Sequence, residues 1–103
     1  PERIGYCPSK AGVIMLTKCI ALEYAPSIRV NAILPGLVRT PMIEQRFTEA
    51  EDPKALEESY ASLYPLHKMG KIEDMANAIA FLSSDESGFI TGEIMQVCGG
   101  SLI

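Results

Sequence analysis

The chain has 103 residues, of which 48% are hydrophobic and 21% are charged, and its formal net charge at pH 7 is -4. This balance is that of a small globular domain and argues against a disordered tail. An acidic chain without clustered Lys and Arg also lacks the basic surface that nucleic-acid binding requires, so nucleic acid is not expected as a partner.

The first predicted element is a helix over residues 8–25. Pro8 suits the first turn of a helix, and Pro26 ends it. Apolar residues cover more than the single stripe of a surface helix, so the sequence predicts two sides in contact with protein, one of them another subunit. Lys18 and Glu23 interrupt the apolar run, which is shorter than the roughly 20 residues that cross a bilayer. No membrane partner is expected.

The next element, residues 28–34, is short, rich in β-branched residues and almost free of charge, as a buried parallel strand should be. Pro35-Gly36 ends it with a turn. From about residue 39 to 69 the sequence becomes polar and acidic, with repeated prolines and short helical patterns near 42–47 and 54–63. This composition predicts a mobile lid after the strand.

A second helix begins at Ile72, where apolar residues repeat at helical spacing and acidic residues occupy the first turn. The sequence predicts that this helix ends at residues 83–85 and that a second strand covers 93–98, between glycines. Strand, helix and strand then form one parallel crossover unit. Because two parallel strands leave an unpaired edge and an uncovered face, a further half of the sheet is expected outside this chain, and the start at Pro1 resembles a cut.

The three cysteines, Cys7, Cys19 and Cys98, form no CxxC pair, and His67 is the only histidine. This spacing predicts neither a disulfide framework nor a metal site, and it favours a reducing, cytoplasmic location. His67 lies in the predicted lid beside Lys68, where a solvated or partner-contacting role is expected over a catalytic one.

Tyr6 and Lys10 are four residues apart, one helical turn, so both can project from the same helix face. A nearby cation and the positive end of a helix dipole both favour phenolate, which lowers a tyrosine pKa from its usual value of about 10. A tyrosine tuned in this way can exchange a proton with an alcohol or carbonyl oxygen while hydride moves to or from a nicotinamide. Taken alone, the spacing is more often that of an ordinary Tyr and Lys on a helix.

The surrounding sequence favours a catalytic pair over an ordinary Tyr and Lys. The relevant segments are Tyr6–Ala11, Leu22-Glu23, Ile28–Met42, Met69-Gly70, Met75-Ala76, Ala80–Ser84, Ile90–Glu93 and Val97–Gly100. Together they closely resemble the second half of the short-chain dehydrogenase/reductase family. The resemblance implies an α/β fold, the C-terminal part of a Rossmann-like doubly wound parallel sheet, in the order helix, strand, lid helices, helix, strand. Residues 1–103 would be the C-terminal half of a single NAD(P)-binding domain, with the lid at about 39–69.

The same resemblance implies roles by position. Tyr6 becomes the general acid/base, and Lys10 lowers its pKa and hydrogen-bonds the nicotinamide ribose. Pro35-Gly36 becomes the turn at which backbone approaches the nicotinamide, although by itself it reads as a simple chain turn. Val38 binds the carboxamide through main-chain groups, and Thr40 reaches the carboxamide or the phosphates. These ligands lie at the C-terminal end of a strand, where open α/β sheets bind cofactors.

The chain departs from the family pattern in several places. The family's carbonyl-polarising Ser, its proton-relay Asn and its Gly-rich phosphate turn would all precede Pro1, and none is present here. Lys68 stands where Arg is common, and Cys98 stands where Asp is common. Both replacements are expected to be tolerated, although the charge lost at Cys98 bears on the closing turn.

The resemblance therefore implies an NAD- or NADP-dependent oxidoreductase that interconverts an alcohol and a carbonyl in a small-molecule substrate, assembled as a homodimer or homotetramer. The isolated chain is expected to be inactive. The alternative hypothesis is a truncated, non-catalytic module that pairs with an intact subunit through the apolar helix. A full-length coding sequence separates the two hypotheses.

Overall fold

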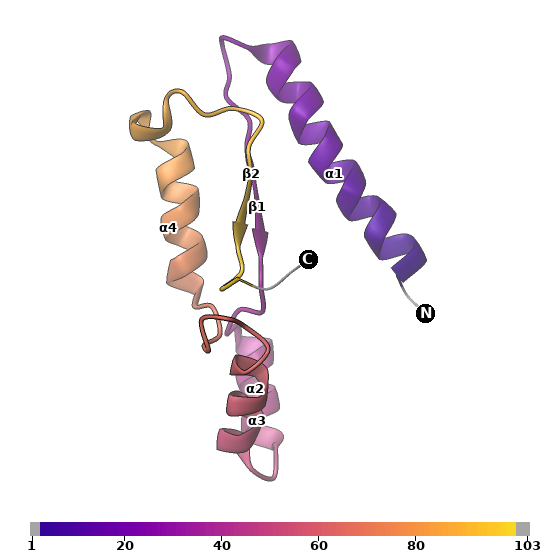
Figure 1. Cartoon of the computed structure of the whole chain (residues 1–103), viewed down its shortest axis with the longest axis vertical. Coiled ribbons are helices and arrows are strands. Elements are labelled where there is room, and N and C mark those ends of the chain that lie inside the picture. The colour runs from indigo at the N-terminus through magenta and orange to yellow at the C-terminus, as the bar shows by residue number, and fades with distance from the viewer. Residues whose placement is uncertain (1–2, 101–103) are drawn as a thin grey trace. The chain divides into compact units, whose positions relative to one another are not determined.

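A computed structural model describes the backbone of residues 3–100 and the side chains of residues 7–100. Its elements, in order, are α1 (Arg3–Tyr24), β1 (Ala32–Pro35), α2 (Pro41–Glu49), α3 (Pro53–Ala61), α4 (Ile72–Ser83), the 3-10 helix η1 (Asp85–Ser87) and β2 (Ile94–Val97) (Figure 1). The expected α/β class and the expected element order are confirmed. No helix in this described part is long and apolar enough to cross a membrane.

Two compact units make up the described chain. The first holds residues 3–33 and 81–95, and the second holds residues 34–80 and 96–100. Helix α1 lies in the first unit, whereas α2, α3 and most of α4 lie in the second.

The predicted start of the first helix, at Pro8, is wrong. Helix α1 begins at Arg3 and carries Pro8 inside it, while its end at Tyr24 agrees with the stop expected before Pro26. A proline has no N–H, so it removes one helical hydrogen bond, but its fixed φ is helical and the residues before it can still form a turn. The preference of proline for the first turn therefore marked a position inside the helix rather than its first residue.

Helix α1 buries a narrow line of residues in its own unit. Thr17 and Ala21 are buried, and Ala21 lies 3.6 Å from the position that a Cβ on Gly92 would take. Other apolar side chains of the helix stay more than half exposed, among them Leu16 and Leu22. Contact of this wide apolar surface with another subunit remains a prediction.

Strands β1 and β2 are hydrogen-bonded neighbours that run in the same direction (Figure 1). The Ala32 N–H donates to the Glu93 carbonyl at 2.9 Å, and the Gly36 N–H donates to the Val97 carbonyl at 3.0 Å. Both pairs have the same offset along the sequence, which is the register of a parallel ladder. The prediction of a second strand over 93–98 is confirmed to within one residue at each end.

The predicted start of the first strand, at residue 28, is wrong by four residues. Residues 29–31 bond to residues 90–93, around a turn at Gly92 whose positive φ of 74° cannot continue a regular ladder. The Val30 N–H donates to the Thr91 hydroxyl at 3.1 Å, and the Gly92 N–H donates to the Val30 carbonyl at 2.8 Å. The Thr91 side chain thus accepts the hydrogen bond that a backbone carbonyl would accept from Val30 in a regular strand.

Two polar side chains before β1 hold the loop that leads into β2. The Asn31 amide donates to the Ile90 carbonyl at 3.2 Å and accepts from the Glu93 N–H at 2.9 Å. The Arg29 guanidinium donates to the Ile90 and Ser84 carbonyls, both at 3.0 Å. These bonds satisfy backbone groups that have no strand partner.

The region predicted as a lid forms a small core of its own. Ile43 and Phe47 of α2 are buried together with Met69, and the rings of Phe47 and Tyr60 lie 5.9 Å apart in a tilted arrangement. Helices α2 and α3 contact each other and begin with proline after an N-cap residue. Both helices agree with the expected patterns near 42–47 and 54–63.

Helix α4 agrees with its prediction in both type and bounds. Its first turn carries acidic residues, and the Asp74 carboxylate accepts from the Lys71 N–H at 2.8 Å, which satisfies a free amide at the helix start. Its apolar face is only partly covered by this chain, because Ile72 and Ile79 remain about half exposed.

Candidate functional site

The end of β1 packs tightly because Gly36 has no side chain. A Cβ built on Gly36 would lie 3.0 Å from the Cys98 Cα, 3.2 Å from the Cys98 carbonyl oxygen and 3.2 Å from Cε1 of Tyr64. Two of these three neighbours are backbone atoms and cannot rotate away. The predicted Pro35-Gly36 turn is therefore a place where two strand ends approach each other more closely than side chains would allow.

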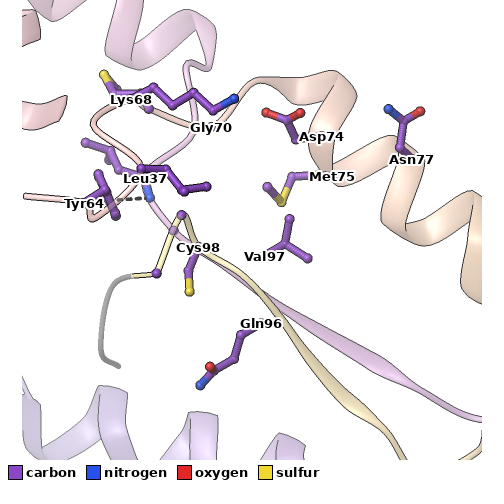
Figure 2. A pocket seen from close by; sticks show the side chains of 15 residues that line it. Leu37, Tyr64, Lys68, Gly70, Asp74, Met75, Asn77, Gln96, Val97 and Cys98 are labelled. Atoms are coloured by element: carbon purple, nitrogen blue, oxygen red, sulfur yellow. Dashed lines mark hydrogen bonds between the residues drawn. The ribbon is translucent and has the colours of Figure 1, made fainter.

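Tyr64, in the loop between α3 and α4, anchors this turn. Its hydroxyl accepts a hydrogen bond from the Leu37 N–H at 2.7 Å, drawn as the dashed line in Figure 2. Its Cβ lies 3.5 Å, and its nearest ring atoms 3.7 Å, from the position that a Cβ on Gly99 would take, which is ordinary van der Waals contact. One aromatic side chain thus meets both the end of β1 and the turn that follows β2.

Val38 pairs with Gly70 in an isolated parallel bridge. The Arg39 N–H donates to the Gly70 carbonyl at 2.9 Å, and the Gly70 N–H donates to the Leu37 carbonyl at 3.1 Å. The amide of Val38 takes no part in these two bonds, whereas its carbonyl accepts from the Thr40 N–H at 2.8 Å. The bridge holds the backbone on both sides of Val38 in a fixed direction.

Thr40 is the N-cap of α2. Its hydroxyl oxygen accepts from the Ile43 N–H at 3.4 Å, and its backbone is extended, as an N-cap requires. A hydroxyl has one donor in addition to its acceptor lone pairs. The hydrogen of Thr40 therefore stays available to donate while the oxygen caps the helix.

A hollow of about 530 Å³ opens beside these backbone segments (Figure 2). Its walls come from the end of β1, the loop 64–70, the first turns of α4 and the end of β2 with its closing glycines. Figure 2 shows Asp74 and Asn77 on the α4 side and Gln96, Val97 and Cys98 on the β2 side. Apolar walls with a few polar groups are typical of a small-molecule site.

The closing turn after β2 depends on two left-handed glycines. Gly99 has a φ of 62° and Gly100 a φ of 90°, and the Gly99 carbonyl accepts from the Leu66 N–H at 3.1 Å. Cys98, just before them, is buried. A small buried thiol fits this position, where the Cys98 backbone packs on Gly36.

Arg39, three residues after the turn, forms ion pairs that no sequence pattern predicts. It donates to the carboxylates of Glu44 and Glu57, each with a shortest distance of 2.6 Å, and its guanidinium lies 4.9 Å from the centre of the Phe47 ring. The hydrogen bond to Glu44 raises the pKa of Arg39 above its ordinary value, with a smaller contribution from Glu57. Arg39 thereby ties α2 to α3.

The predicted acid/base pair lies in the first unit. Tyr6 and Lys10 both belong to the continuous helix α1, which places them one turn apart along the backbone. The side chain of Tyr6 lies outside the described residues. Lys10 is exposed and has an interaction partner in this chain. The four cofactor candidates Pro35, Gly36, Val38 and Thr40 are brought together in the second unit.

His67 is exposed, as expected, in a left-handed backbone conformation with a φ of 54°. Its N–H donates to the Tyr64 carbonyl at 2.8 Å, so it closes the turn that carries Tyr64. Within the part of the chain that the structure describes, no group of three or more His, Cys, Asp or Glu side chains is placed to hold a metal ion.

Comparison with known proteins matches almost the whole sequence. The family described as Enoyl-(Acyl carrier protein) reductase matches residues 1–101. The chain is 42% identical over 100 residues to a 7alpha-hydroxysteroid dehydrogenase from Clostridium sardiniense, and it covers 36% of that protein. It is 43% identical over 104 residues to a 3-oxoacyl-[acyl-carrier-protein] reductase from Thermotoga maritima, of which it covers 40%. The chain thus spans well under half the length of these curated relatives.

Solved structures agree with these relatives. A deletion mutant of Thermoplasma acidophilum aldohexose dehydrogenase superposes with a TM-score of 0.83 at 36% identity, over 91% of this chain and 43% of that one. A 4-hydroxyisoleucine dehydrogenase complexed with NADH gives 0.81 at 40% identity, over 97% and 40% of the two chains. ElxO with NADP bound gives 0.84 at 35% identity, over 96% and 39%. Sequence, fold and order of elements all agree, and the chain therefore belongs to the short-chain dehydrogenase/reductase family.

Proposed function

We propose that this chain supplies the acid/base pair and the nicotinamide-side backbone of an NAD(P)-dependent oxidoreductase that interconverts an alcohol and a carbonyl. One observation carries the proposal: Tyr6 and Lys10 lie one turn apart on the continuous helix α1, in a chain that matches the family over residues 1–101. Relatives with dehydrogenase and reductase activities support the reaction type.

Tyr6 is the proposed proton donor and acceptor. When hydride adds to a carbonyl carbon, the oxygen must gain a proton, and in the reverse direction it must lose one. Lys10 is one helical turn along α1, and a cation at that distance favours the phenolate form of a tyrosine. Proximity to the helix N-terminus acts in the same direction, because the positive end of the helix dipole favours an anion.

The backbone after β1 suits a nicotinamide. Gly36 lets main chain come close without a side chain between, and the Val38 amide takes no part in the hydrogen bonds of the bridge with Gly70. Thr40 keeps one hydroxyl donor beyond its capping bond. A carboxamide has both donor and acceptor atoms, so main-chain groups of Val38 and the Thr40 hydroxyl suit it chemically. Bound NAD(P) would supply the hydride chemistry, as in the relatives solved with NADH and NADP.

The proposal also covers the organisation of the molecule. Residues 1–103 would be the C-terminal half of a single NAD(P)-binding domain, with residues 39–69 as the lid over a small-molecule substrate. We further propose a cytoplasmic homodimer or homotetramer. The isolated chain would be inactive, since the family's carbonyl-polarising Ser and phosphate turn lie outside it. NAD(P)H turnover by homogeneous 103-residue material would contradict this last point.

The test is Tyr6→Phe in the full-length gene product that carries this sequence. Loss of the acidic proton should lower kcat by about 100- to 10,000-fold, the usual contribution of general acid/base catalysis, while NAD(P)H binding measured by fluorescence titration persists. Tyr24→Phe is the matched control, because Tyr24 ends the same helix and is about half exposed. Equal kcat values for the two variants would overturn the assignment of Tyr6.

A second candidate function is a non-catalytic interaction module. The observation that favours it is the exposure of large apolar side chains on α1, including Met15, Leu16 and Leu22 at 57–81%. Such a surface is typical of a protein contact. If the full-length gene product neither binds NAD(P)H nor reduces carbonyls, yet the chain forms a stoichiometric complex with an intact family subunit, the module is the better description.

A further inference from the structure

We propose that Tyr64 is a positioning residue for the cofactor, acting through the Leu37 amide. This inference rests on the proposed function, because it assigns a role to a side chain at the nicotinamide-side turn. Tyr64 lies in the loop between α3 and α4, in a stretch where the family resemblance has no signature, so no role for it follows from the family pattern.

The peptide group between Gly36 and Leu37 is held by Tyr64. The Leu37 N–H donates to the Tyr64 hydroxyl at 2.7 Å, a short hydrogen bond between a half-buried side chain and the backbone. The same ring lies 3.2 Å from the position of a Cβ on Gly36, so it contacts the turn as well as bonding to it.

The next peptide group, between Leu37 and Val38, is held from another direction. Its carbonyl accepts from the Gly70 N–H at 3.1 Å. Because a trans peptide is planar, the Val38 N–H in the same group points opposite to that carbonyl, away from Gly70. Two consecutive peptide planes are thus oriented by two different partners, and together they fix the backbone angles of Leu37. The direction of the Val38 amide depends on both.

Tyr64 is itself held in place, so that it can orient the peptide group between Gly36 and Leu37. Its N–H donates to the Ala61 carbonyl at 3.2 Å, its carbonyl accepts from His67, and its ring packs beside Gly99. The contact joins residues that are 27 positions apart in the sequence. Without the hydroxyl, the Leu37 amide would lose the acceptor that it has among the described residues, and the first peptide plane would lose the hydrogen bond that orients it.

The variant Tyr64→Phe removes the hydroxyl and keeps the ring. One neutral hydrogen bond corresponds to about three- to tenfold in an equilibrium constant, so the Kd for NAD(P)H and the KM for the cofactor should rise by that factor. The kcat at saturating cofactor and the pH dependence of kcat should stay near wild type, because the proposal assigns proton transfer to Tyr6 and gives Tyr64 a role in cofactor binding alone. A purely structural role would instead lower the unfolding midpoint without this split between KM and kcat.

Tyr60→Phe is the matched control. Tyr60 lies one helical turn earlier on α3, is also half-buried, and its hydroxyl has no hydrogen bond among the described residues. NAD(P)H fluorescence titration of the full-length protein, without substrate, compares both variants with wild type. A Kd that rises in Tyr64→Phe and not in Tyr60→Phe supports the proposal. Equal affinities for the two variants would refute it while leaving the proposed function intact, and a wild-type protein that binds no NAD(P)H would refute both.

Discussion

Replacement of Gly36 by alanine tests whether the end of β1 is as closely packed as its geometry indicates. The added Cβ would meet the Cys98 Cα at 3.0 Å and the Cys98 carbonyl oxygen at 3.2 Å, and neither atom can move without shifting the β2 backbone. Gly36 does not lie in the left-handed region, so the backbone conformation itself is open to alanine. Any loss of stability therefore reports the steric contact and not a strained φ.

The magnitude follows from two opposing effects. Overpacking of a well-packed site destabilises by about 1–3 kcal/mol. Restriction of the unfolded chain by alanine offsets about 0.4–1 kcal/mol of that. The free energy of unfolding should therefore fall by roughly 1–2 kcal/mol. In a protein of about 150–250 residues, each kcal/mol lowers Tm by about 2–4 °C. Movement at Cys98 would also lengthen the 3.0 Å bond from the Gly36 N–H to the Val97 carbonyl.

Urea unfolding of the full-length protein measures the change in the free energy of unfolding. NAD(P)H titration of the same samples measures whether a shifted turn at residue 36 changes cofactor affinity. Gly12→Ala is the matched control, because a Cβ at Gly12 meets nothing within 4 Å and alanine favours an α-helix by about 0.5–1 kcal/mol over glycine. The two glycine substitutions should therefore change stability in opposite directions. A Gly36→Ala protein as stable as wild type, with unchanged cofactor affinity, would refute the close approach of the strand ends.

Two further substitutions test interactions that hold the loops. Asn31→Leu removes both hydrogen bonds to the loop before β2 and should lower the free energy of unfolding by about 1–3 kcal/mol in urea titrations, whereas Asn77→Leu, at an exposed α4 position, should have a much smaller effect. Arg39→Met breaks the ion pairs with Glu44 and Glu57, for an expected loss of about 0.2–1 kcal/mol per pair that shrinks in 1 M NaCl. Because the pKa of Arg39 is raised, its contribution is complete below the ordinary arginine pKa and is lost only as pH rises through the raised value, so the loss measured at pH 9 should equal that at pH 7. A loss that disappears between these two pH values would contradict that assignment.

Helices and strands with a strong local sequence pattern could be predicted from the sequence. Strand bounds that depend on a distant segment of the chain could not. Helix α4 was predicted in both type and bounds, because its apolar spacing and acidic first turn are local signals. The start of β1 was placed too early because Ile28 and Val30 are good strand residues. Whether they join a ladder depends on the turn at Gly92, which lies about 60 residues away.

Some residues of the candidate site could also be predicted from local sequence, and others could not. Pro35-Gly36 and Thr40 follow a buried strand directly, so their position at its C-terminal end could be inferred from sequence order. Tyr64 could not be found, because its partner Leu37 is 27 positions distant and the loop around it has no pattern that marks a contact. Arg39 was missed for a similar reason, since its two carboxylates come from two different helices.

The small core of α2 and α3 has a practical consequence for exchanging this segment between relatives. Ile43 and Phe47 are buried together with Met69, and Leu37, Leu56 and Tyr60 pack against them. Leu37 and Met69 come from outside the two helices. A segment exchanged between relatives can therefore be cut after Arg39 and before Tyr64, provided that the incoming helices offer apolar contacts for Leu37 and Met69 and carboxylates for Arg39. Such a chimaera would carry new helices while the turn at Gly36 and its contact with Tyr64 stay native.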